Sequence, residues 1–313
     1  MTEYYIEDDF PKNEAEFDAR FAQPEACYQY LFRIKWPEGF VCCACGHTRY
    51  WKSSRNLYIC RHCEHQHSLT AGTIVHGSKK PITSWFKAMW WFTTRKSGIS
   101  AVSLQHLLGL SYATAWCWLQ KLRSCTIRSG RTKLSGTVEV DEFYLGGVAS
   151  GKRGRGAAHK SIVVAAVEKQ GRKLGRIRLQ HIADCSQNSL VQFVADAVDP
   201  ECTVITDGWT GYGSKFSKNY DHITVLQSTA PDKAKTLPGV HLVAALVKRL
   251  FLGTFQGRFD PKNLQRYLDE YVFRFNRRTS THVGKKFMRI VQQAMVTKPM
   301  PYHALVLTPH TSA

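Results

Sequence analysis

Four cysteines between residues 42 and 63 have the spacing of a metal site. They form two Cys-x-x-Cys pairs, Cys42 with Cys45 and Cys60 with Cys63, and fourteen residues separate the pairs. In each pair a tight turn lets both sulfurs bind one ion, and a hairpin between the pairs would bring the four thiolates together. Four thiolates make a closed tetrahedral Zn²⁺ site, which stabilises a fold rather than a reaction. The spacing therefore predicts a structural zinc ribbon.

Other potential ligands crowd the same stretch, so the ligand set could differ by one residue. They are Cys43, His47, His62, His65 and His67. We interpret them as exposed side chains or as hydrogen-bonding partners of the ligands. We expect the ribbon to present a basic loop with Arg49, Lys52 and Arg55 to nucleic acid, although zinc ribbons also bind other proteins.

Two aspartates end strand-like runs in the second half of the chain. Asp141 follows the β-branched run "GTVEV", and Asp207 ends "CTVITD". Carboxylates at the ends of neighbouring strands can share divalent cations, because hard oxygen ligands suit Mg²⁺. Two such ions activate water and stabilise the leaving oxygen in phosphoryl transfer. A single aspartate at a strand end is more often a cap or turn residue, but two of them followed by a polar helix face favour a metal site.

That polar face belongs to a helical segment in which Lys248 follows His241 by seven residues. Seven steps of about 100° leave the two side chains roughly 20° apart, so one face of the helix carries both. We expect this face to supply a third contact to metal or phosphate.

The overall charge indicates a polyanionic partner. The chain has 313 residues, with 43 Lys and Arg against 24 Asp and Glu, and a net charge of +19. Such an excess favours nucleic acid over an anionic membrane surface. The acids would hold metal, while the basic side chains would contact the phosphate backbone.

No segment is predicted to cross a membrane or to direct secretion. The most apolar run, "VHLVAALVKRLFLGTF", is interrupted by Lys248 and Arg249 before it reaches the roughly 20 residues of a span, which favours a buried helix. The first residues are acidic and lack the order of a signal peptide. We therefore expect a cytoplasmic, reducing environment, in which the ten cysteines are metal ligands and buried thiols.

Two helices joined by a short turn are predicted between residues 99 and 123. The first ends at Gly109, and the second starts at Tyr112 with Ala115, Trp116 and Leu119 at core spacing. The glycine in the turn fits a helix-turn-helix whose second helix enters the major groove of DNA. The side chains at the start of that helix would read the bases, and they are Ser111, Tyr112 and Thr114. The alternative is an ordinary helical hairpin.

From about residue 135 the pattern is α/β. The strand-like runs "GTVEVDEFYLGG", "SIVVAAVE", "GRIRLQHI" and "CTVITDGW" alternate with the helix-like "SQNSLVQFVADAV". A basic, glycine-rich segment at 150–160 is expected to be a mobile loop between the first two strands. The tail from about 298 is expected to be irregular.

A last helix is predicted in "FDPKNLQRYLDEYVFRFNRR", with Asp260 as its N-cap. Glu270, Arg274 and Arg277 fall at i, i+4 and i+7, on one face of this helix. They could form an intrahelical ion-pair ladder of about 0.2 to 0.5 kcal/mol per pair. We prefer an auxiliary role near DNA or the active site.

Taken together, these motifs resemble a known family, the DDE-type transposases of bacterial insertion sequences. The resemblance is to the zinc-ribbon group numbered fifteen ninety-five, also called ISXO2-like, and it extends from about Cys42 to Arg278. It is carried by the ribbon and by the segments "TAGTIVHGSKKPITSWFKAMW", "VEVDEFYLGG", "TDGWTGY", "HLVAALVKRLFLGTFQG" and "LQRYLDEYVFRFNRR".

The resemblance implies a ribonuclease-H-like core in which Asp141 and Asp207 are the first two metal-binding acids. The third position, usually Glu or Asn followed by a lysine seven residues later, is His241 here, and Lys248 matches the lysine. Imidazole is a poor Mg²⁺ ligand and a better Mn²⁺ ligand, so His241 is expected to orient the scissile phosphate or a water instead. Glu270, Arg274 and Arg277 match a glutamate-arginine-arginine signature of the family.

Two further acids of the first strand, Glu139 and Glu142, are less favoured as ligands. Glu139 shares a strand face with Asp141 by alternation, but it lies further from the strand end.

The sequence therefore predicts a multidomain α+β protein. Its expected segments are an N-terminal helical lead-in (1–35), a zinc ribbon (36–78), a helix-turn-helix region (79–130), a ribonuclease-H-like α/β catalytic domain (135–295) and a tail (296–313).

The expected function is that of a transposase that binds double-stranded DNA at terminal inverted repeats. It would use structural Zn²⁺ and catalytic Mg²⁺ or Mn²⁺ to cut the element's ends and join them to target DNA. We expect a homo-oligomer on DNA, in a bacterial cytoplasm near the nucleoid. Besides the helix-turn-helix side chains, the expected DNA contacts are Arg153, Arg155, Lys248, Arg249, Arg274 and Arg277. The alternatives are a DNA-binding regulator with an inactive core and a nuclease that cuts without joining.

Overall fold

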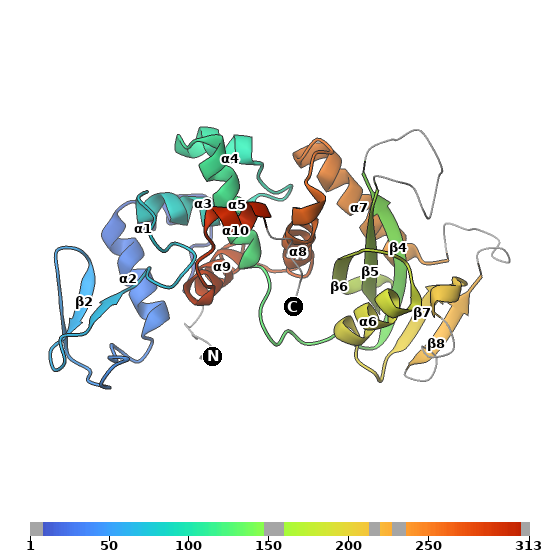
Figure 1. Ribbon diagram of the computed structural model, residues 1–313, viewed down its shortest axis with the longest axis horizontal. Coiled ribbons are helices and arrows are strands. Elements are labelled where there is room, and N and C mark those ends of the chain that lie inside the picture. Colours follow the sequence, from blue (N-terminus) through green and yellow to red (C-terminus); the bar gives the residue numbers. More distant parts are fainter. Residues whose placement is uncertain (1–8, 147–159, 213–219, 227–235, 308–313) are drawn as a thin grey trace. The chain divides into compact units, whose positions relative to one another are not determined.

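The computed structural model describes residues 9–146, 160–212, 220–226 and 236–307 (Figure 1). The described chain is a mixed α+β protein with two compact units. Unit 1 comprises residues 9–126 and 280–307, and unit 2 comprises the described part of 127–279. The expected catalytic segment, 135–295, extends past the boundary at 279 into unit 1.

Unit 1 is mainly helical and contains one small sheet. Its strands pair antiparallel in the order β1-β2-β3. Its elements are α1 (Glu14–Phe21), α2 (Pro24–Lys35), β1 (Tyr50–Lys52), β2 (Leu57–Cys60), β3 (Gln66–Ser68), α3 (Ile82–Thr94), α4 (Ala101–Leu108), α5 (Tyr112–Ser124), α9 (Gly284–Val296) and α10 (Tyr302–Leu307).

An aromatic cluster ties the last helices of unit 1 to the first. The Phe17 ring stacks on Trp90 with centroids 4.7 Å apart, and Phe287 of α9 meets Phe17 edge-on at 5.4 Å. Aromatic pairs in such arrangements add to the free energy gained by burial. Phe287 therefore explains why α9 packs with α1 and α3. The apolar face of α9 predicts that this helix is packed, but not which helices it packs against.

The tail is more regular than the sequence suggested. The expectation of irregular chain from about 298 is wrong for residues 302–307, which form α10. Leu305 is buried, and Tyr302 lies against Trp116 of α5 with ring centroids 6.4 Å apart. Tertiary packing stabilises this short helix, which would be marginal by itself.

Unit 2 is built on a five-stranded sheet in the order β6-β5-β4-β7-β8. β4 runs antiparallel to β5 and β5 antiparallel to β6, whereas β4, β7 and β8 run parallel. The four predicted strands are present. The fifth strand, β8, was not predicted, because most of its side chains are exposed. The strands are β4 (Thr137–Leu145), β5 (Ser161–Gln170), β6 (Lys173–Ile182), β7 (Thr203–Asp207) and β8 (Asp221–Val225).

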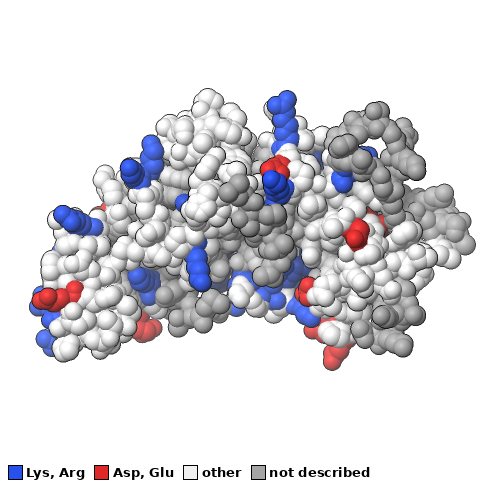
Figure 2. Space-filling model, viewed as in Figure 1, with Lys and Arg blue, Asp and Glu red and all other residues white. Residues whose placement is uncertain are grey.

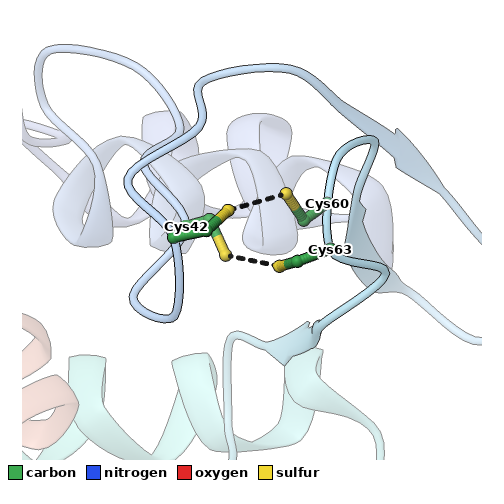
Figure 3. Close-up of side chains that lie close together, drawn as sticks. Cys42, Cys60 and Cys63 are labelled. Atoms are coloured by element: carbon green, nitrogen blue, oxygen red, sulfur yellow. Dashed lines mark hydrogen bonds between the residues drawn. The ribbon is translucent and has the colours of Figure 1, made fainter.

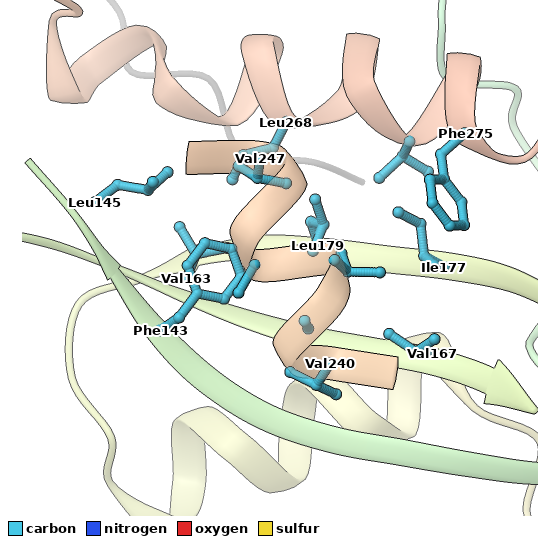
Figure 4. Close-up of a cluster of buried hydrophobic side chains, with 14 of the residues drawn as sticks. Phe143, Leu145, Val163, Val167, Ile177, Leu179, Val240, Val247, Leu268 and Phe275 are labelled. Carbon is cyan, nitrogen blue, oxygen red and sulfur yellow. The ribbon is translucent and has the colours of Figure 1, made fainter. Parts of the chain in front are cut away.

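Helices cover both faces of this sheet. The helix α6 (Gln187–Ala197) and the 3₁₀ turn η1 (Thr210–Tyr212) pack on one face, against Val138 and Val140. The helices α7 (Pro238–Thr254) and α8 (Leu264–Phe275), the latter preceded by the turn η3 (Pro261–Asn263), share a core with the opposite face (Figure 4). Alternate residues of β4, such as Phe143 and Leu145, belong to this second core.

The apolar run forms α7, and the predicted burial is confirmed for one face of this helix, whereas Leu242 and Leu252 on the other face are exposed. Its inward residues, including Val240, Val243 and Val247, are almost fully buried against the sheet. Among the described residues no helix has the length and apolar character needed to cross a membrane.

Side-chain amides of α8 and the turn after it satisfy the edge of the sheet at β6. Gln265 accepts a hydrogen bond from the His181 N–H (2.8 Å) and donates to the Leu179 carbonyl (3.1 Å). Asn276 likewise accepts from the Ile177 N–H (2.8 Å) and donates to its carbonyl (3.1 Å). The two amides pair with backbone groups that an edge strand otherwise leaves open to other chains.

Candidate active site and metal centre

The ribbon cysteines lie on two similar turns. Within the first turn the Gly46 N–H donates to the Cys42 carbonyl (2.9 Å), and within the second the Glu64 N–H donates to the Cys60 carbonyl (3.1 Å). Both Gly46 and Glu64 have positive φ angles, of 73° and 57°. This conformation folds each Cys-x-x-Cys pair so that both sulfurs point the same way.

The geometry of the four sulfurs fits a tetrahedral ion. The Sγ atoms of Cys42 and Cys63 are 3.6 Å apart, as are those of Cys45 and Cys60 (Figure 3). All four lie within 4.8 Å of one another. A tetrahedral zinc with bonds of about 2.3 Å requires sulfurs about 3.8 Å apart. This cluster therefore supports a structural Zn²⁺.

Backbone hydrogen bonding favours the thiolate form of Cys60. Desolvation of this buried thiol raises its pKa, but the backbone N–H groups of Cys63 and His62 and the neighbouring Cys45 and Cys63 thiols outweigh that effect and leave the pKa at about 6. The His62 N–H lies 3.4 Å from the sulfur. A thiolate is the form in which cysteine binds metal.

The other potential ligands of the ribbon lie outside this cluster of four. His47 and His62 face each other with ring centroids 5.6 Å apart. His67 is buried, and its Nε2 lies 3.3 Å from Cys42 Sγ, as expected for a hydrogen-bonding partner of a ligand. Burial lowers the pKa of His67 and so favours the neutral ring, with the charges of His65 and Lys35 acting in the same direction.

The predicted pair of helices in unit 1 is present. α4 ends at Gly109, whose φ of 59° is readily adopted by glycine. Ser111 then caps α5 by accepting a hydrogen bond from the Thr114 N–H (3.2 Å), and its hydroxyl lies 2.8 Å from that of Thr114. Two of the three expected base-reading side chains thus form the N-terminal cap, whereas Tyr112 is 54% exposed.

One core residue of α5 differs from the expectation. Ala115 and Leu119 are buried, but Trp116 is only partly buried. Trp118 is buried instead, and it stacks on Trp85 of α3 with ring centroids 3.9 Å apart. The partner helix α3, which the spacing within α5 could not reveal, decides which tryptophan is inside.

In unit 2 the strand register brings the two predicted acids together. β4 and β7 pair in parallel with Glu139 opposite Ile205. Asp141 and Asp207 each lie two residues beyond this last pair, on neighbouring strands. Asp207 ends β7 as predicted, but the prediction that Asp141 ends a strand is wrong, because β4 continues to Leu145 through its pairing with β5. Both side chains point to the α7 face of the sheet, because Ile205 and Phe143 belong to that face.

Each of these carboxylates accepts a hydrogen bond from the backbone that follows it. Asp141 Oδ1 accepts from the Glu142 N–H (2.8 Å), and Asp207 Oδ1 accepts from the Trp209 N–H (3.1 Å). Asp141 is 8% exposed. The bonds hold one oxygen of each group and so limit the orientations of the carboxylates.

The helix α7 places two more predicted residues over the same strand. His241 Nε2 is 3.9 Å from Asp141 Oδ2. Lys248 Nζ lies 5.8 Å from the centre of the Phe143 ring, two residues beyond Asp141 on β4. One face of α7 thus brings His241 and Lys248 to the strand that carries Asp141, as the seven-residue spacing predicted.

Negative charge gathers around Asp141 and Asp207. The buried hydroxyl of Tyr212 has a pKa well above its usual value, first because of burial and then because of the nearby carboxylates of Glu142, Asp141 and Asp207. Such a concentration of acids is an environment in which a divalent cation is favourable.

Glu139 has a structural function that the sequence did not reveal. Its Oε2 accepts hydrogen bonds from the Gly239 N–H (2.7 Å) and the Val240 N–H (3.1 Å), and its Oε1 lies 3.2 Å from Lys169 Nζ. These N–H groups begin α7, which has no capping side chain of its own. A carboxylate at this position satisfies unpaired donors and interacts favourably with the helix dipole. The hint in the sequence is the Pro-Gly start of the helix. Glycine leaves room for the carboxylate there, because an added Cβ at Gly239 would lie 2.7 Å from Glu139 Oε2.

The expected auxiliary residues form local contacts. Arg274 and Glu270 make a buried ion pair of 2.5 Å along α8, the intrahelical alternative considered above. Arg277 lies beyond the end of α8, and its guanidinium stacks over Phe273 at 4.2 Å.

The remaining predicted DNA contacts are basic side chains of different segments. Arg49, Lys52, Arg55, Lys248 and Arg249 are exposed. Figure 2 shows Lys and Arg spread over the visible face with acidic side chains among them. Arg153 and Arg155 lie outside the described residues.

Two protein-family models match this chain. Residues 133–276 match the model of the ISXO2-like transposase domain, and residues 23–66 match the model of the transposase zinc-ribbon domain. The chain is also 23% identical over 214 residues to an uncharacterized protein in transposable element ISH50 of Halobacterium salinarum, a match that covers 61% of this chain and 70% of that protein. The chain belongs to the ISXO2-like transposase family. The first match contains Asp141, Asp207, His241 and Lys248, and the second contains the four ribbon cysteines.

Proposed function

We propose that this protein catalyses metal-dependent cleavage of DNA at the ends of an insertion sequence and joins those ends to target DNA. The observation that carries the proposal is the pairing of β4 with β7, which places Asp141 and Asp207 two residues beyond the same strand pair, with His241 Nε2 3.9 Å from Asp141 Oδ2. Membership of a transposase family supplies the substrate class.

The fold of unit 2 is proposed to be a ribonuclease-H-like core. Three successive antiparallel strands, followed by two parallel strands added beside the first, support this assignment. Helices on both faces support it as well. In this arrangement β4 and β7 are neighbours although they are distant in sequence.

The carboxylates of Asp141 and Asp207 are proposed to hold Mg²⁺, or Mn²⁺. Oxygen donors on a rigid sheet fit hard divalent cations. When bound, these ions would lower the pKa of a coordinated water and stabilise the leaving oxygen. In the first step water attacks the phosphorus at the element's end and releases a 3′-hydroxyl. In the second step that hydroxyl attacks a target phosphodiester and displaces a new 3′-hydroxyl.

His241 is proposed to orient the scissile phosphate or the attacking water. Its Nε2 lies close enough to Asp141 to act on a group held there, and imidazole is a poor ligand for Mg²⁺. Lys248 and Arg249, exposed on the same helix, would contact phosphates. Arg274 and Arg277 are proposed as auxiliary residues. The ion pair with buried Glu270 is also sufficient to explain the position of the Arg274 side chain.

The DNA-binding part is proposed to comprise the ribbon and a helix-turn-helix formed by α4 and α5. Tyr112 at the exposed start of α5 and the exposed Arg49, Lys52 and Arg55 support this assignment. The terminal inverted repeats of the element would be its specific sites. Because joining acts on two ends at once, we propose that the protein assembles as a homo-oligomer on DNA.

The test is cleavage of a duplex that contains the element's end, with Mg²⁺ or Mn²⁺. Asp141→Asn is expected to lower the rate about 10³-fold, or about 4 kcal/mol, because it removes a metal-binding charge, while DNA binding persists. The control is Asp196→Asn, which changes an exposed aspartate of α6 in the same unit and should leave the rate unchanged. Full activity of Asp141→Asn would refute the site.

A second candidate function is a DNA-binding regulator without catalysis, and His241 at the third position favours it. Wild-type protein that binds the ends but cuts them with neither metal would establish the regulator. Cut ends that are never joined would instead identify a nuclease. Inverted repeats flanking the gene are expected only for the transposase of a mobile element.

A further inference from the structure

A second group of metal-binding side chains lies beside the four cysteines of the ribbon. Cys43 Sγ is 3.7 Å from His65 Nε2 and 3.9 Å from His67 Nδ1. The three ligand atoms all lie within 4.8 Å of one another. This group, which we call the Cys43 cluster, shares no residue with the cluster of four cysteines.

Secondary structure brings the three side chains together. Cys43 lies in the first cysteine turn, and His67 lies in β3, which pairs with β2 through His67 opposite Tyr58. His65 and His67 are two residues apart, so a β conformation directs both rings to the same side. Their ring centroids are 4.7 Å apart. The fold of the ribbon thus assembles the cluster without help from the rest of the chain.

The distances are those of a metal site. A tetrahedral zinc with a sulfur bond of about 2.3 Å and nitrogen bonds of about 2.0 to 2.1 Å requires sulfur and nitrogen to be about 3.6 Å apart. The two sulfur–nitrogen distances of the Cys43 cluster are 3.7 and 3.9 Å. Small movements of exposed Cys43 and His65 side chains would complete the geometry.

His67 is already oriented for this function. Its Nδ1 faces Cys43, while its Nε2 lies 3.3 Å from Cys42 Sγ. The rings of Phe40 and Trp36 meet the imidazole edge-on at 5.1 and 5.9 Å and fix its plane. Metal-binding histidines commonly donate the N–H of the second nitrogen to an acceptor. A metal on Nδ1 leaves the proton on Nε2, where it is donated to the Cys42 thiolate.

We propose that Cys43, His65 and His67 bind a second Zn²⁺ ion beside the structural zinc. One thiolate and two imidazoles are a donor set that suits zinc and disfavours Mg²⁺. Three protein ligands leave the fourth position to water or another ligand, and the exposure of Cys43 and His65 opens that position to solvent. The imidazole of His67 links the two ions through Cys42, so each site helps to orient the ligands of the other.

The first test is zinc stoichiometry of the full chain. Protein is loaded with Zn²⁺, freed of loose metal by gel filtration and measured by elemental analysis. We expect two zinc ions per wild-type chain and one in Cys43→Ser and in His65→Gln. The matched control is His62→Gln, an exposed histidine of the same ribbon outside both clusters, which should keep two.

The second test identifies which ion is lost. With Co²⁺ in place of Zn²⁺, the absorption of a tetrathiolate site should remain in Cys43→Ser, and the wild-type minus variant spectrum should show one thiolate with nitrogen ligands. Retention of the tetrathiolate signal also shows that the ribbon is folded.

Three results would overturn the proposal. They are one zinc per wild-type chain, two zinc ions in Cys43→Ser, and loss of the tetrathiolate signal in Cys43→Ser, which would make Cys43 a ligand of the structural site. None of these measurements involves DNA or catalysis, so the proposal stands or falls independently of the transposase assignment.

Discussion

The ribbon cluster and the proposed catalytic site of unit 2 are organised in opposite ways. In the ribbon, all four cysteines lie within residues 42–63, on two similar turns of the same hairpin. In unit 2, Asp141 and Asp207 come from distant parts of the chain and lie on neighbouring strands because β4 and β7 pair. The first centre is local in sequence, whereas the second exists only in the folded sheet.

The difference lies in what stabilises each region. The strands of the ribbon are only three or four residues long, so we expect the structural zinc to supply much of its stability. The sheet of unit 2 has an apolar core on each face, so packing can position its acids. Metal is therefore expected to be part of the fold in the ribbon and, under the proposed function, part of the chemistry in unit 2.

Zinc removal should produce the largest effect and separate the two regions. A chelator is expected to unfold the ribbon, because binding of a structural zinc contributes about 10 kcal/mol or more. Hydrogen exchange would show loss of protection in β1–β3 and none in β4 and β5. Cys45→Ser and Cys60→Ser should act like the chelator, and Cys117→Ser, a half-buried thiol of α5, should not. Equal loss of protection in both regions would contradict the comparison.

A buried ion pair should give the next effect, confined to unit 2. Glu168 is 3% exposed and accepts hydrogen bonds from the Ser135 N–H (2.9 Å) and the Arg176 N–H (2.8 Å) and side chain. Glu168→Gln is expected to lower the free energy of unfolding by about 2 kcal/mol at pH 7. This value is below that for fully buried pairs because Arg176 is a third exposed.

The pH dependence of this loss follows from the pKa of Glu168. Burial raises the pKa, but Arg176 and the backbone donors outweigh burial and hold it below the usual 4.5. A lowered pKa contributes stability that is present above 4.5 and is lost as the pH falls through the lowered value. Urea unfolding should therefore show the gap between wild type and Glu168→Gln closing in acid. A gap that persists there would refute this origin, and exposed Glu201→Gln should show no gap at any pH.

The start of α7 should give the smallest effect on stability. Gly239→Ala places a Cβ 2.7 Å from Glu139 Oε2, so the carboxylate or the helix must move. We expect a loss of about 1 kcal/mol and slower DNA cleavage, because α7 carries His241 and Lys248. Gly253→Ala, in the same helix but with no atom within 4 Å of the added Cβ, should be neutral or stabilising by about 0.5 to 1 kcal/mol. Equal effects of the two substitutions would show that only helix propensity matters.

Local patterns predicted most of the elements. The alternating runs gave β4 to β7, and Gly109 with Ser111 marked the boundary between α4 and α5, because caps and periodicity act within a few residues. The prediction failed where packing decides. β8 is exposed, α10 depends on burial of Leu305, and Trp118 rather than Trp116 is inside because it stacks on Trp85.

The candidate sites show the same division. The spacing of cysteines predicted the ribbon cluster, and the seven-residue spacing predicted that His241 and Lys248 share a helix face, since each involves one turn or one helix. The cap that Glu139 provides for α7 and the edge contacts of Gln265 and Asn276 join residues 84 to 100 positions apart. No pattern within a segment identifies such partners.

The sequence by itself determined that this protein has a ribbon, helices and strands of these kinds, and that Asp207 ends a strand, whereas Asp141 proved to lie inside β4. Those features depend on residues a few positions apart, where backbone geometry fixes the relation between side chains. Only the tertiary structure decided that Asp141 and Asp207 lie on neighbouring strands, that His241 approaches Asp141, and that Cys43 meets two histidines of β3 and the turn before it. Strand register and packing set these contacts. Both arise only when segments that are distant in sequence come together and bury apolar surface.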